Sequence, residues 1–172
     1  MAGSLIKISE VIVTTATPSV TLTGINSTYD VYMLKASGIV VPASSNGDLR
    51  VTTSGTADTS ANYYYAYKGL RSDTTYTNLS NTSQTSFTTV FQWSSYTTSG
   101  ITGNGIIYLF NFNNASEYSF ITNESSTQWQ NGVLGMQGGG VHTVAQTCDG
   151  IQWFGTGGNT TAGTFTLYGL KK

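Results

Sequence analysis

The chain has 172 residues, of which 38% are hydrophobic, 12% aromatic and only 9% charged, with a net charge of -1. An ordinary globular domain carries a charge on about 25% of its residues, so this chain is unusually uncharged while still apolar enough to build a core. The apolar content therefore argues against an intrinsically disordered chain. Its seven Lys and Arg residues form no basic stripe, which argues against binding of nucleic acid.

The low charge also bears on how the molecules associate. Ser, Thr, Asn and Gly supply most of the polar surface, so little charge of either sign keeps copies of the chain apart. We expect much of the surface to be buried in a permanent assembly, with a homo-oligomer as partner and a trimer as the favoured state. The alternative is a merely neutral soluble domain.

Cysteine usage and the N-terminus bound the cellular context. The single cysteine, Cys148, excludes an intramolecular disulfide. The start, MAGSLIKISEVIV, lacks the charged region and continuous apolar run of a signal peptide. No stretch approaches the ~20 apolar residues of a membrane span. We expect synthesis in a cytoplasm without an export signal, and no membrane partner.

Short runs of β-branched and aromatic residues, cut by Gly, Asn, Asp and Ser, predict strands from end to end. The first run is Leu5 to Thr14, where a period of two places Ile6, Ile8 and Ile12 on one face. Glu10 falls on that same face, which indicates a bulge or an edge position.

The next segments differ in how buried they are expected to be. Asp30 to Leu34 is apolar on both sides and predicts a central strand covered on two faces. Tyr63 to Tyr67 predicts a Tyr-rich strand. Ser72 to Ser86 is a long polar stretch, and it is either a surface loop or a poorly paired edge strand.

The second half continues the pattern. Phe87 to Trp93 alternates, with Thr89 on the same face as Phe87, Phe91 and Trp93. The segment 123–132 predicts a polar loop. Further strands are expected at Val20–Leu22, Leu49–Thr53, Ile106–Phe112, Tyr118–Ile121, Val141–Ala145, Ile151–Trp153 and Thr164–Leu170.

No segment has apolar residues at helical spacing. Frequent turns between short strands predict an all-β fold, an antiparallel β-sandwich or jelly roll of about 8–10 strands. The chain shows no linker, composition shift or internal repeat, so we expect one domain over residues 1–172.

The residue types of catalysis are present without a catalytic pattern. The one histidine, His142, is separated from Cys148 by six residues, or roughly 20 Å of extended chain, and this spacing matches no metal motif. No nucleophile elbow precedes a serine, and no two of the eight acidic residues stand out as a glycosidase pair. We expect no catalytic residue, no metal, no cofactor and no enzymatic activity.

Aromatic side chains offer one candidate for ligand binding, because exposed rings stack on sugars. Trp129 lies in the expected loop 123–132, and Tyr63, Tyr65 and Tyr67 share one face of a strand. Alternating tyrosines are also typical of a core or a subunit interface, and Trp129 has the alternatives of packing beneath its own loop or into a neighbouring subunit. Trp129 is the residue that we single out as a possible glycan contact.

The C-terminal segment Gly150–Lys172 reads GIQWFGTGGNTTAGTFTLYGLKK, and Gly103–Asn114 reads GNGIIYLFNFNN. Together with Ser4–Leu34, these segments resemble small β-sandwich or jelly-roll structural proteins in the virions of tailed bacteriophages, often marine or cyanobacterial ones. The closing motif GTF-x-LYGL carries most of the resemblance. It implies a sandwich on a phage tail or head surface and no catalytic residues, and residues 35–100 match nothing in that family.

The resemblance implies a protein of the virion, and two roles stay open. The first is a capsid decoration, cement or head-surface protein, which the short length and the lack of a shaft favour. The second is a tail-fibre or tail-tip module that binds a host glycan, with Trp129 and the segments 72–86 and 123–132 as its binding surface. The expected partners are copies of the chain and other capsid or tail proteins.

Overall fold

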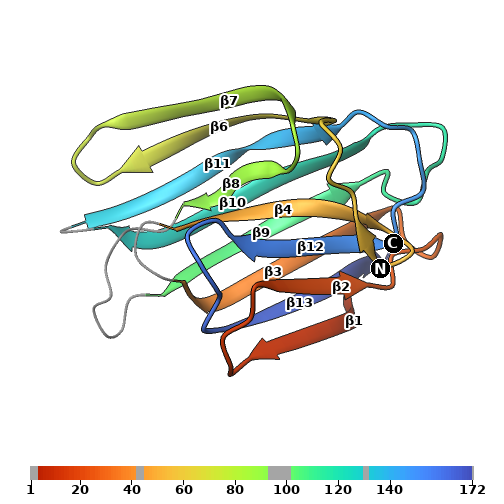
Figure 1. The fold of residues 1–172 in the computed structure, drawn as a ribbon, viewed down its shortest axis with the longest axis horizontal. Coiled ribbons are helices and arrows are strands. Elements are labelled where there is room, and N and C mark those ends of the chain that lie inside the picture. Colours follow the sequence, from red (N-terminus) through yellow and green to blue (C-terminus); the bar gives the residue numbers. More distant parts are fainter. Residues whose placement is uncertain (1–3, 42–44, 93–101, 130–131, 172) are drawn as a thin grey trace.

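The computed structural model describes residues 4–41, 45–92, 102–129 and 132–171 (Figure 1). These residues form thirteen strands and no helix, and every pairing between strands is antiparallel. The prediction of an all-β, antiparallel, sandwich-like fold is confirmed. The strands outnumber the expectation because polar segments expected as loops also pair.

Two sheets form the two layers (Figure 1). In the order of their pairing, the larger sheet contains β1 (Ser4–Val13), β13 (Ala162–Lys171), β3 (Val31–Val40), β9 (Gly103–Phe110), β10 (Ser119–Trp129), β11 (Gly132–His142), β6 (Tyr63–Arg71) and β7 (Tyr76–Gln84). The smaller sheet contains β2 (Ser19–Thr23), β12 (Gly150–Gly155), β4 (Asn46–Thr53) and β5 (Thr56–Ala57), and β8 (Phe87–Gln92) also pairs with β4. The hydrophobic core lies between the two sheets.

β1 is an edge strand with a bulge, as Glu10 indicated. Lys7 pairs with Tyr168 and Ser9 pairs with Leu167, so Ile8 is the extra residue. The bulge reverses which residues face inward, because one inserted residue shifts a period of two. The expectation that Ile12 shares the face of Ile8 is wrong: Ile12 is 63% exposed.

β3 is an interior strand, as its apolar residues predicted. Tyr32 and Leu34 belong to the core between the sheets. Met33 is buried on the opposite face, where its register neighbours are Tyr108 on β9 and Tyr168 on β13. The larger sheet is therefore apolar on its outer side as well as its inner side at this strand.

Two polar segments pair as strands. Within 72–86, β7 forms the edge of the larger sheet, so the edge-strand alternative is correct. The expected loop at 123–132 is wrong, because β10 continues to Trp129 and β11 begins at Gly132. Backbone pairing needs no apolar side chain, and the Nδ2 of buried Asn123 donates a hydrogen bond of 2.7 Å to the carbonyl oxygen of Val90.

β8 departs from simple alternation. Thr89 has a φ of 58°, in the left-handed region, and its backbone N–H donates to Asp48 Oδ1 at 2.8 Å. This irregularity brings Val90 into the core together with Phe87 and Phe91, so the segment does not follow the expected simple alternation. Trp93 lies outside the described residues.

The core aromatic rings lie directly on glycine backbone. Trp153 on β12 is fully buried, and its ring centroid lies 5.2 Å from that of Phe91 and 5.5 Å from that of Phe165. A Cβ added to Gly47 on β4 would lie 1.6 Å from the Trp153 ring. The ring thus occupies the space that any side chain at position 47 needs.

We predict that Gly47→Ala destabilises the fold by about 1–3 kcal/mol or more, because a methyl group displaces the Trp153 ring from a packed core. Urea unfolding followed by tryptophan fluorescence measures the change. Gly135→Ala is the matched control, since its added Cβ would meet its nearest neighbour, the Ser125 carbonyl oxygen, at 3.4 Å. Equal stability of the two variants would contradict this packing.

Candidate functional site

The one histidine lies in a buried polar cluster at the end of β11. His142 is 0% exposed, and its Nε2 lies 2.9 Å from Asp58 Oδ2. The hydroxyl of Tyr63 donates to the Asp58 carbonyl oxygen at 2.7 Å. The neighbouring Asp149 serves a different turn, since its carboxylate accepts hydrogen bonds from Thr52 Oγ1 and the Gly55 backbone N–H, each at 2.8 Å.

Two potential nucleophiles lie in the same region. Ser119 is the register partner of His142 across β10 and β11, and its hydroxyl donates to Cys148 Sγ at 3.8 Å. All three side chains are 0% exposed. A nucleophile with no exposed surface cannot meet a substrate, so the cluster holds strands together in this structure. The described residues contain no group of three His, Cys, Asp or Glu side chains able to hold a metal.

Burial dominates the protonation of His142. It lowers the pKa of His142, and this effect outweighs the Asp58 carboxylate, which acts in the opposite direction. Burial also acts to raise the pKa of Asp58, but hydrogen bonds from Ser60 and the interaction with His142 leave that pKa lowered. The neutral ring donates from Nε2–H to Asp58, and its buried Nδ1 has no hydrogen-bond partner among the residues that the structure describes.

We predict that the free energy of unfolding falls as the pH is lowered from about 7.5 to about 5.5. His142 in the unfolded chain titrates near ~6.5 and binds a proton more readily than in the fold, so protonation favours unfolding. His142→Gln should flatten this dependence, because the chain has no other histidine. Urea unfolding at a series of pH values measures it. A parent protein equally stable, or more stable, at the acid end would contradict the assignment.

We also predict that Cys148 is unreactive in the folded protein. Burial raises the pKa of its thiol, and the side chain is 0% exposed, so little thiolate is formed or accessible. Ellman's reagent should label it slowly in buffer and completely in urea. Fast labelling of the folded chain would place Cys148 in an accessible site.

The outer face of the larger sheet is rich in exposed apolar side chains. It presents aromatic and aliphatic side chains that no second layer of the described residues covers. Phe120 is 44% exposed, Tyr64 38%, Tyr108 37% and Ile106 37%. One row crosses five adjacent strands in register and is apolar throughout: Val31, Phe110, Phe120, Val141 and Tyr64.

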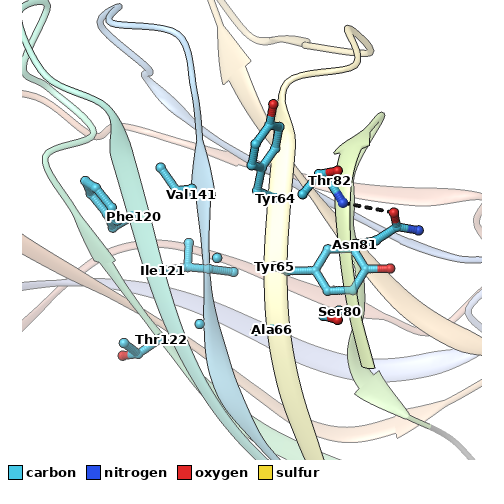
Figure 2. Close-up of a pocket in the computed structure, with 12 residues that line it drawn as sticks. Tyr64, Tyr65, Ala66, Ser80, Asn81, Thr82, Phe120, Ile121, Thr122 and Val141 are labelled. Atoms are coloured by element: carbon cyan, nitrogen blue, oxygen red, sulfur yellow. Dashed lines mark hydrogen bonds between the residues drawn. The ribbon is translucent and has the colours of Figure 1, made fainter. Parts of the chain in front are cut away.

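A shallow depression lies on this face (Figure 2). It has a volume of about 560 Å³. Phe120 and Thr122 on β10 stand to one side and Tyr64 on β6 to the other (Figure 2). Gly139 on β11 is the register partner of Thr122 on β10 and of Ala66 on β6, so it lies between these strands and has no side chain. The missing side chain leaves a hollow among aromatic neighbours.

The tyrosines expected to bind sugars do not present an exposed row. Tyr63, Tyr65 and Tyr67 do share one face of β6, but it is the inner face: Tyr63 and Tyr67 are buried, and Tyr65 stacks on Tyr67 with ring centroids 4.9 Å apart. Trp129 ends β10, and its side chain lies outside the described residues. The apolar outer face could not be predicted from the sequence, because alternation of apolar and polar residues does not say which side of a sheet a second layer covers.

Comparisons with protein-family models, curated proteins and solved structures found no match to this chain. Among the described residues, no helix is long and apolar enough to cross a membrane.

Proposed function

We propose that the protein is a non-enzymatic structural component of a tailed-phage virion, a decoration, cement or head-surface protein that associates with copies of itself. The observation that carries this proposal is the uncovered apolar outer face of the larger sheet, around Tyr108 and Phe120. Soluble monomers rarely expose a large contiguous apolar patch, and such patches mark interaction surfaces.

The buried groups support a structural role over catalysis. His142, Ser119 and Cys148 are withdrawn from solvent and serve internal hydrogen bonds. The virion assignment itself is supported by the resemblance of the ending GTFTLYGLKK and by the low charge of the chain. A surface with few charges is suited to being covered permanently by neighbouring copies.

Glycan recognition by a tail module has weaker support. Both segments expected as binding loops, 72–86 and 123–132, are largely strands of the larger sheet. The exposed lining of the hollow at Gly139 is mainly apolar, with Tyr64 and Phe120 at its rim. The hydrogen-bonding side chains that also line it, those of Ser80, Asn81, Thr82 and Thr122, are what a sugar would have to use.

We predict that the protein is present in purified particles of the phage that carries its gene. Mass spectrometry of gradient-purified particles detects it, and cryo-electron microscopy locates it on the head. Absence from particles, or a gene outside any phage genome, would contradict the proposal.

Purified particles also test whether the outer face of the larger sheet is the contact surface. Phe120→Gln in the phage gene should reduce incorporation, since it removes an exposed ring of the outer face. Phe154→Gln is the control, because Phe154 is an aromatic on the smaller sheet, covered by the Arg50 guanidinium at 4.2 Å. Equal incorporation of the two variants would exclude the outer face as the contact.

A further inference from the structure

Four charged side chains lie in a single row that crosses the outer face. Read from β1 to β7, the register partners in this row are Glu10, Thr166, Lys35, Ile106, Glu124, Gln137, Lys68 and Asn78. A charge occurs on every second strand, and its sign alternates: negative, positive, negative, positive. Adjacent strands are about 4.8 Å apart, so successive charges are about 10 Å apart.

The alternation is antisymmetric about β9. Rotation by 180° about an axis that runs along β9, in the plane of contact, places Lys35 of one copy opposite Glu124 of the other. The same rotation places Glu10 opposite Lys68. No other strand as axis pairs all four charges with their opposites, and an axis perpendicular to the strands sets like charges against each other.

We propose that the outer face binds a second copy of the chain about a two-fold axis along β9. A two-fold contact uses the same patch on both copies and must be self-complementary, as this row is. Facing sheets prefer strand directions within about 30° of each other, and this rotation keeps the strands of the two copies nearly parallel.

Shape complementarity supports the same axis. In the neighbouring row, the register partners on β13, β3, β9, β10 and β11 are Tyr168, Met33, Tyr108, Thr122 and Gly139. The rotation sets Tyr108 against its own counterpart and Tyr168 opposite Gly139 of the other copy. A bulky ring thus meets the hollow of Figure 2, where a side chain is missing.

The same rotation also brings apolar side chains of the two copies together, in the row that contains Val31, Phe110 and Phe120. Phe110 faces its counterpart across the axis, and Val31 faces Phe120 of the second copy. Ile106 therefore lies between the inner charge pairs and the row of Met33 and Tyr108 borders them on one side, which strengthens those pairs by excluding water on that side. This inference rests on the proposed function, because it names a copy of the chain as the partner of the outer face. It gives a dimer contact in place of the trimer favoured from the sequence.

Charge reversal tests the axis. Lys35→Glu and Glu124→Lys should each weaken self-association by at least ~10-fold, because each sets like charges against each other twice per dimer. A mixture of the two variants should form a heterodimer as tight as the parent, since both of its contacts then join opposite charges. Sedimentation velocity over a concentration series measures the dissociation constants, and native mass spectrometry identifies the heterodimer.

The control is Glu117→Lys, which makes the same charge change in the connection between β9 and β10, outside the row; it should dimerise like the parent. Circular dichroism checks that every variant is folded. A monomeric or trimeric parent, or a mixture that fails to dimerise, would overturn the inference. A parent that is monomeric yet present in particles would overturn only this two-fold contact, whereas a dimer absent from particles would overturn only the virion role.

Discussion

Aromatic rings that lie on glycine backbone set the geometry of the whole sandwich. Trp153 occupies the space above Gly47, and Phe87 and Phe91 lie against the larger sheet at Gly140 and Gly105. A Cβ at any of these glycines would approach a ring within 2.6 Å or less. Gly105 and Gly140 leave room on the larger sheet for the rings of β8, so these two contacts help to set how the sheets align. Gly47 lies on β4, beside the strand of Trp153 in the smaller sheet, and leaves room for that ring within the same sheet.

This packing leaves the two faces of the larger sheet with different roles. The inner face supplies the core and encloses the His142–Asp58 pair, so its polar groups serve the fold. The outer face is apolar around Tyr108 and Phe120 and has no second layer among the described residues. A sheet that is apolar on both faces needs two coverings, and the residues that the structure describes supply one. A second copy supplies the other in the account proposed here.

The fold class follows from the sequence because alternation and turn residues are local properties. The central position of β3 was predicted from apolar residues on both its faces, and the edge and bulge of β1 from the position of Glu10. The inward face of each strand was less predictable, because the extra residue at Ile8 reverses it in β1 and the irregularity around Thr89 adds Val90 to the core beside Phe87 and Phe91. Trp129 was misplaced because polar strands lack the apolar alternation that marks a strand. The His142–Asp58 contact joins residues 84 positions apart, which no local pattern reveals.

The central claim is that the outer face of the larger sheet is covered in the working state of the protein. An experimental structure of the protein in its assembled form tests this most directly. The account predicts that β9 lies at a two-fold axis, with Tyr108 and Phe120 buried against a second copy. A structure in which the assembly uses another surface and these rings remain in solvent would contradict it.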